Sequence, residues 1–239
     1  MKTHKEQKLL EMYEAKGFGT CEICEECRMD VISAGHSRLS FPAGAFFVGE
    51  NFDIQNIKLL IVGKIARGDY GDTYGGGMCN GRDLYNGTGK YPESKSWPFW
   101  AYTRQIAKNI FGVETCENIA MTNIVQCNNS EDIDMTLGTT KNHCIVDLGA
   151  VKEEIRVIKP NTVIFYTVVD YGNYTEHAFD EYSQKIATRI AVGQKSMKWN
   201  EGVGIIDGSP VNVLCIGHPE RLNKNDYTNA VSQWIKQVN

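Results

Sequence analysis

The sequence predicts an α/β fold, a three-layer α/β/α sandwich around a central, mainly parallel four-stranded sheet. One observation is a set of apolar runs without the alternation of a half-exposed strand, which is typical of parallel strands covered on both faces. A second is the presence of helix-like segments between these runs, because alternating strands and helices build this architecture. In such a sheet, ligands bind at the carboxyl ends of the strands.

The predicted strands are four short apolar segments. They are residues 57–63 (IKLLIVG), 118–125 (NIAMTNIV), 161–168 (NTVIFYTV) and 211–217 (VNVLCIG). Their length and their content of isoleucine and valine favour buried strands over helices.

Four further segments are predicted to be helices. They are residues 96–112, 144–160, 179–190 and 227–238. The first has apolar residues at helical spacing from Phe99 to Ile110, with Ser96 as a candidate cap and Gly112 as its end. The second has a stripe from Cys144 to Ile158, and Pro160 is predicted to end it.

The remaining segments have no clear period. Residues 66–96 are rich in glycine and are predicted to form a long loop after the first strand. A loop of that length inside a domain is usually functional or mobile. Residues 28–56 and 191–210 are also predicted to be irregular.

The composition is that of an ordinary soluble globular protein, with 42% hydrophobic and 23% charged residues. A length of 239 residues suits one domain over residues 1–239, with an N-terminal extension that carries cysteines. The net charge of -4 excludes a broadly basic surface, so any nucleic-acid contact must use a local patch. No apolar run approaches the roughly 20 residues of a membrane span. We therefore expect a cytoplasmic monomer with no membrane contact.

Cysteines are more numerous than packing requires. Five of the eight lie in one short cluster or near the ends of predicted elements, namely Cys21, Cys24, Cys27, Cys127 and Cys144. In a reducing compartment, clustered thiols indicate a metal or catalytic site before they indicate disulfides. Cys79, Cys116 and Cys215 stand alone and are expected to be structural.

Three of the predicted strands end in polar motifs. These are GKIARGD (63–69), TNIVQC (122–127) and GHPERL (217–222). Because the carboxyl ends of parallel strands meet at one edge of a sheet, the three motifs are expected to converge there.

Together the motifs resemble the uracil-DNA glycosylase superfamily, and most closely its iron-sulfur branch. That branch has a glycine-rich motif after the first strand, an asparagine motif of the type TNVVKC and a late HPxxL motif. TNIVQC and HPERL match the second and third, and the resemblance runs in order over nearly the whole chain. It implies a DNA glycosylase that hydrolyses the N-glycosidic bond of uracil, or a related deaminated base, in base excision repair.

The resemblance also implies a 4Fe-4S cluster held by four cysteine thiolates. The branch takes ligands from an N-terminal C-x2-C pair, from the asparagine motif and from the head of a later helix. The corresponding residues here are Cys24, Cys27, Cys127 and Cys144. CEICEEC contains two overlapping pairs, so Cys21 is an alternative to Cys27. A structural zinc ion would use the same residues.

The chemistry of the motif residues agrees with this activity. An enzyme that removes a base must extrude the nucleotide and read the edge of the base in a pocket. The amide of Asn123 offers a donor and an acceptor that match O4 and N3-H of uracil, and cytosine reverses that pattern. His218 can donate a hydrogen bond to O2, where negative charge collects as the bond breaks. Pro219 fixes the backbone after the histidine.

The first motif departs from the branch. The resemblance implies contacts to the base from residues Gly63, Lys64, Ile65 and Ala66, but Lys64 stands where the branch has an acid. A lysine cannot orient water as a carboxylate does. Asp69 is therefore predicted to be the catalytic carboxylate that orients the water, with Asp72 as the alternative. A second alternative is attack on the sugar by the Lys64 amine.

The aromatic residue that stacks on the base is expected in the glycine-rich loop. Tyr85, in NGRDLYNG, is predicted to be this residue, and Tyr74 is the alternative.

Other readings of the same residues remain open. Asn123 can be a satisfied core amide, and His218 can cap a turn. A superfamily member without activity would bind nucleic acid or a nucleotide. A small-molecule enzyme or redox protein would use the cluster for electron transfer.

Overall fold

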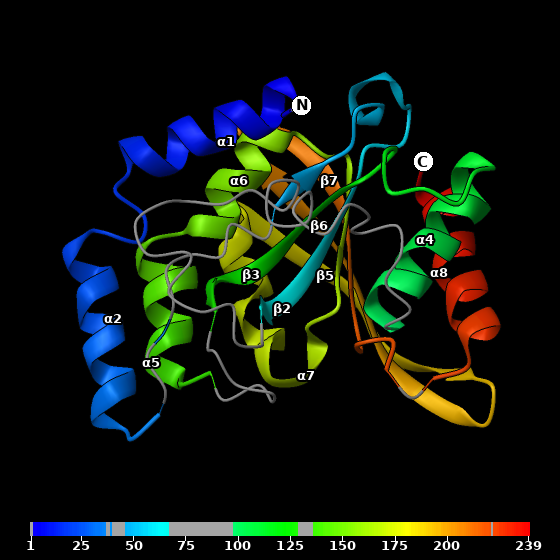
Figure 1. Cartoon of the computed structure of the whole chain (residues 1–239). Helices are drawn as coiled ribbons and strands as arrows, with labels where there is room; N and C mark the ends of the chain where they lie inside the picture. Colours follow the sequence, from blue (N-terminus) through cyan, green and yellow to red (C-terminus); the bar gives the residue numbers. More distant parts are fainter. Residues whose placement is uncertain (1, 37–38, 40–45, 67–97, 129–135, 221) are drawn as a thin grey trace.

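The computed structural model describes residues 2–36, 39, 46–66, 98–128, 136–220 and 222–239, and its centre is a seven-stranded sheet (Figure 1). The strand order is β1-β3-β2-β4-β7-β6-β5. The strands are β1 (Phe47–Val48), β2 (Leu59–Ala66), β3 (Ala120–Asn128), β4 (Thr162–Phe165), β5 (Glu181–Val192), β6 (Lys195–Ile206) and β7 (Ser209–Ile216). The α/β class is confirmed, but the expectation of a four-stranded sheet is wrong.

The four predicted strands form the parallel part of this sheet. β3, β2, β4 and β7 are neighbours in parallel register, whereas β1, β6 and β5 are antiparallel to their neighbours. In β2, the side chains of Leu59 to Val62 are fully buried, and alternate residues enter two different hydrophobic clusters. Burial on both faces explains why these strands read as continuous apolar runs.

Helices cover both faces of the sheet (Figure 1). On one face lie α1 (His4–Ala15) and α6 (Ala150–Ile158), and on the other lie α4 (Pro98–Phe111) and α8 (Lys224–Val238). The remaining elements are α2 (Glu22–Ser33), η1 (Phe52–Ile54), α5 (Gly138–Lys141), η3 (Asn142–Asp147), α7 (Val168–Tyr171) and η4 (Gly172–Ala178). α2 packs against α5 and η3. The three layers therefore agree with the sequence prediction.

The largest error of the sequence prediction is at residues 179–190. The predicted helix is strand β5, and the segment predicted to be irregular, 191–210, holds β6 and the start of β7. Ile186 and Ile190 are four residues apart, which fits a helix, but Thr188 and Val192 extend the same set with a period of two. Pairing with β6 along the whole strand selects the second period.

The other helix predictions fare better. α4 ends at Phe111, and Gly112 follows at a φ of +81°, as predicted; Ser96 lies outside the described residues. The segment 144–160 is divided, because Gly149 at a φ of +61° separates the π-helical η3 from α6. The fourth segment is confirmed by α8, where the Asn223 side chain accepts a hydrogen bond from the N-H of Asp226.

Helix α1 is an element that the sequence reasoning did not predict. It begins with a capping box between Thr3 and Glu6, and it buries Leu9 and Tyr13 completely against the sheet. Within the described part of the chain, no helix has the length and apolar character needed to cross a membrane.

Candidate functional site

The strand order reverses at β2, which places a switch point at the carboxyl end of this strand. The chain passes from β2 to β3 on one side, and then returns to β4 on the other side of β2. This reversal is the switch point at which open α/β sheets bind ligands. Gly63, in the first motif, pairs with Asn123, in the second, at this end of the sheet.

Gly63, Asn123 and Phe99 lie in contact on the α4 side of the sheet. A Cβ placed on Gly63 would clash with Oδ1 of Asn123 and would lie 3.2 Å from Cε2 of Phe99. The Asn123 amide therefore occupies the space that any side chain at position 63 would fill. Phe99 is in the first turn of α4, and both it and Asn123 are only partly buried.

His218 follows β7 and lies on the same side of the sheet. Its ring is nearly parallel to that of Phe99, with 6.1 Å between the ring centroids and 18° between the planes. The Tyr166 ring packs at its edge, with centroids 6.5 Å apart. The N-H of Glu220 donates to Nδ1 of His218 over 3.3 Å. In the neutral ring the proton is then on Nε2, so the ring offers a donor on that side.

The segment that carries His218 is held by hydroxyl groups from both helices of this face. Tyr227 in α8 donates to the carbonyl oxygen of Gly217 over 3.0 Å, and Tyr102 in α4 donates to that of Leu222 over 2.6 Å. Burial raises the pKa of both tyrosines, so the hydroxyl groups keep their protons. Such bonds fix the backbone on both sides of the histidine.

Lys64 points to the other face of the sheet. Its Nζ lies 2.9 Å from Oδ2 of Asp170 and 5.6 Å from the centre of the Tyr171 ring, both in α7. The hydrogen bond from Lys64 lowers the pKa of Asp170. Successive residues of a strand face opposite sides, so the ammonium group lies away from Asn123. Gly63 thus lies beside Asn123 and Phe99, whereas the Lys64 side chain lies on the opposite face.

The other predicted site residues are placed as follows. Ile65 is buried in the core, and Ala66 ends β2 after an irregularity in the pairing. Asp69, Asp72, Tyr74 and Tyr85 lie outside the described residues.

Sequence reasoning missed Phe99, because its spacing marked it only as part of the apolar stripe of a helix. A preceding Trp-Pro and a position in the first helical turn were its only other signals.

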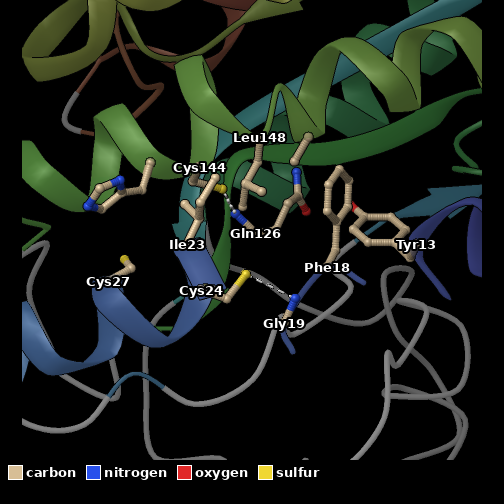
Figure 2. A pocket seen from close by; sticks show the side chains of 12 residues that line it. Tyr13, Phe18, Gly19, Ile23, Cys24, Cys27, Gln126, Cys144 and Leu148 are labelled. Atoms are coloured by element: carbon tan, nitrogen blue, oxygen red, sulfur yellow. Dashed lines mark hydrogen bonds between the residues drawn. The ribbon is translucent and has the colours of Figure 1, made fainter. Parts of the chain in front are cut away.

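A second candidate site is a pocket on the α1 side, with a volume of about 340 Å³ that includes open solvent (Figure 2). All four predicted metal ligands, Cys24, Cys27, Cys127 and Cys144, line it. Figure 2 shows Cys24 and Cys27 projecting from α2 toward the side that carries Cys144. Cys21 is not among the lining residues, although its Sγ lies 3.3 Å from that of Cys24.

The surroundings of these thiols favour the neutral form. Burial raises the pKa of Cys24 and of Cys144 to about 12, and it also raises the pKa of Cys27 and Cys127. The cysteines raise one another's pKa as well, because their thiolates would repel. A bound cationic centre would offset both effects, since metal binding replaces the protons of its ligands.

Backbone N-H groups already point at two of the sulfur atoms (Figure 2). Gly19 donates to Sγ of Cys24 over 3.1 Å, and Gln126 donates to Sγ of Cys144 over 3.4 Å. Hydrogen bonds to sulfur are a feature of iron-sulfur sites. Among the described residues, no three His, Cys, Asp or Glu side chains are arranged to hold a single metal ion. Within the described residues, the four thiols thus line one pocket without being gathered around a single ion.

Comparison with known proteins does not place the chain in a family. No family model matches it, and no curated protein matches it. A functional assignment therefore depends on the geometry of the two sites and on the motifs that form them.

Proposed function

We propose that this chain is a DNA glycosylase of the uracil-DNA glycosylase superfamily, which hydrolyses the N-glycosidic bond of uracil or a related deaminated base. One observation supports this most strongly. The residues of the asparagine and histidine motifs, far apart in the sequence, meet with Gly63 and Phe99 on one side of the switch point. An amide, an imidazole and an aromatic ring gathered at this place suit recognition of a planar base.

In this proposal Asn123 reads the base and Phe99 forms the wall of the pocket. The Asn123 amide pairs with O4 and N3-H of uracil, and its position against Gly63 limits the rotamers that it can adopt. Phe99 takes the role first predicted for Tyr85. An aromatic ring beside a flipped base is a usual part of such pockets.

His218 stabilises the departing base. As the bond between the base and C1' breaks, its electron pair moves onto the base and collects at O2. The Nε2-H of the neutral ring donates to that oxygen, and the acceptor role of Nδ1 keeps the ring in this tautomer. The bonds from Tyr102 and Tyr227 hold the backbone of this segment in place before the reaction begins.

Water completes the hydrolysis by bonding to C1', and its proton passes to the carboxylate that orients it. We assign its orientation to Asp69, as the motif predicts. The ion pair with Asp170 argues against attack by the Lys64 amine, since the ammonium group is charged and on the other face. Water is therefore the nucleophile of the proposed reaction.

We further propose that Cys24, Cys27, Cys127 and Cys144 hold a 4Fe-4S cluster. The support for this proposal is that all four thiols line one pocket and that the sulfur atoms of Cys24 and Cys144 accept backbone N-H bonds. The cluster would supply covalent links between α2, β3 and η3 rather than chemistry at the base. DNA with a deaminated base is the expected partner.

The test is base release from oligonucleotides that contain uracil, hypoxanthine or xanthine. His218→Ala should slow single-turnover release of the preferred base by about 10²–10³-fold and leave DNA affinity nearly unchanged. Asn123→Ala should lose the preference for uracil over cytosine. Asp207→Ala, in the exposed turn between β6 and β7, is the control and should release base at the wild-type rate. DNA binding without release of any base by metal-replete wild-type protein would replace this proposal with the non-catalytic alternative.

A further inference from the structure

The β5–β6 hairpin extends beyond the edge of the sheet at which the proposed base pocket lies (Figure 1). β5 and β6 pair from Glu181 with Ile205 to Val192 with Lys195. β7 pairs with β6 only as far as Trp199, which lies opposite Ile216. Residues 189–198, the tip of the hairpin, therefore continue past the carboxyl end of β7, next to the segment of His218.

The hairpin tip is anchored on one of its faces. Val192 and Met197 are almost fully buried on the α8 side, and Met197 packs against Gly217. At the turn, Gly193 lies against Asn223 and Asp226 at the start of α8. This packing gives the tip a fixed position relative to His218.

The opposite face of the tip is exposed and basic. Arg189 lies directly opposite Lys198 in the ladder, so both side chains point to the same face, and both are exposed. From residue 182 to residue 200 the chain has four basic residues and no Asp or Glu, whereas its overall net charge is -4. The Arg189 guanidinium donates to the hydroxyl and carbonyl oxygens of Ser196. Like charges directly opposite in a sheet are destabilising, and a bound anion would offset that repulsion.

The basic face continues along the side of the sheet that is opposite to Asn123 and His218. Lys198 is close enough to Asp170 to lower the pKa of that carboxyl group, and so are Lys64 and Lys141. Nζ of Lys141 also lies 3.1 Å from the carbonyl oxygen of Asp170. Three lysines thus surround one carboxylate, which leaves the edge between the hairpin and β2 positive. This is the local patch that a chain of net negative charge needs to bind nucleic acid.

We propose that the face of the hairpin formed by Arg189 and Lys198 binds the phosphodiester backbone of the DNA strand whose base is bound by Asn123 and His218, where that strand crosses the carboxyl edge of the sheet to the opposite face. The inference rests on the proposed function for the identity of the strand. Arginine binds phosphate through two parallel N-H donors, and lysine binds it as a point charge. The fixed position beside His218 lets backbone contacts set the register of the strand without reading its sequence.

The test is fluorescence anisotropy of a labelled single-stranded DNA, with and without one uracil, over a range of salt concentrations. Each phosphate contact on a single strand contributes about 0.7 to the slope of log affinity against log salt. Arg189→Gln with Lys198→Gln should therefore reduce the slope by about 1.4. The ratio of wild-type to variant affinity should then be about 25-fold larger at 0.1 M salt than at 1 M salt. The loss should be the same with and without uracil.

The matched control is Lys8→Gln with Lys108→Gln, which removes the same charge from exposed positions on α1 and α4. It should leave affinity and slope close to wild type. Equal effects of the two double variants would overturn the proposal, and so would a hairpin variant that loses binding to RNA of the same sequence but not to DNA. Base release at saturating DNA is measured separately. If the wild-type protein releases no base, the proposed glycosylase activity is refuted, but the proposed phosphate contact is not.

Discussion

Gly63→Ala is the change that most directly tests the contact between the first and second motifs. The new Cβ would clash with Oδ1 of Asn123 and lie 3.2 Å from the Phe99 ring. Asn123 is only partly buried, so its side chain can rotate away. The amide would then leave the position in which it pairs with the base, while the fold remains.

The expected cost can be worked out from this contact. Two neutral hydrogen bonds to the base contribute about 0.5–1.5 kcal/mol each, so their loss lowers kcat/KM for uracil by roughly 5- to 150-fold. Extra volume in a packed region costs about 1–3 kcal/mol in stability, and replacing a glycine returns about 0.4–1 kcal/mol through the unfolded chain. We therefore expect a large change in activity with a modest change in the melting temperature.

The assay is single-turnover release of uracil by Gly63→Ala, by Asn123→Ala and by the double variant, with thermal unfolding of each. Because alanine at position 63 acts by displacing Asn123, the double variant should be no slower than Asn123→Ala alone. Gly138→Ala is the control, since a Cβ there meets nothing within 4 Å. Wild-type activity in Gly63→Ala, or losses that add in the double variant, would refute the reasoning.

Two further predictions concern the α1 side. We expect anaerobically purified wild-type protein to be brown, with absorbance near roughly 400 nm. Cys24→Ser or Cys144→Ser should abolish both signals, whereas Cys21→Ser should keep them. Colourless wild type with stoichiometric zinc would reject the cluster. Burial raises the pKa of Glu154 from 4.5 to about 8. Between these two pH values the folded state therefore binds more protons than the unfolded chain. The free energy of unfolding then falls as pH rises, by at most about 1.4 kcal/mol per pH unit. Glu154→Gln should lack this slope in denaturant unfolding, and a stability difference from wild type that is independent of pH would contradict the assignment.

The sequence predicted the parallel strands well because burial on both faces leaves a continuous apolar pattern. It failed at β5, because Ile186 and Ile190 fit both the spacing of a helix and the alternation of a strand. Only pairing with β6 decides between the two. It did not predict α1, since Leu9 and Tyr13 are few among charged residues and their burial is a tertiary effect. Local patterns thus specified the centre of the sheet but not its antiparallel edge.

The candidate site was predictable where a motif ends a strand. Asn123 and His218 were placed by the rule that ligands bind at the carboxyl ends of parallel strands. The direction of the Lys64 side chain was not predictable, because it depends on Asp170, which is far away in the chain. Phe99 and the basic hairpin were missed for the same reason, since their roles arise only from residues that the fold brings beside them.

Strand β3 joins the two candidate sites. Asn123 points to the α4 side, whereas its neighbour Thr122 donates to Oε2 of Glu154 over 2.6 Å on the α6 side. Four residues after Asn123, Cys127 lines the cysteine pocket, and the N-H of Gln126 bonds to Cys144. A group bound by the cysteines would thus restrain the same strand that presents the amide to the base. Loss of that group should therefore loosen Asn123 and reduce discrimination between bases, without removing any residue from the base pocket itself.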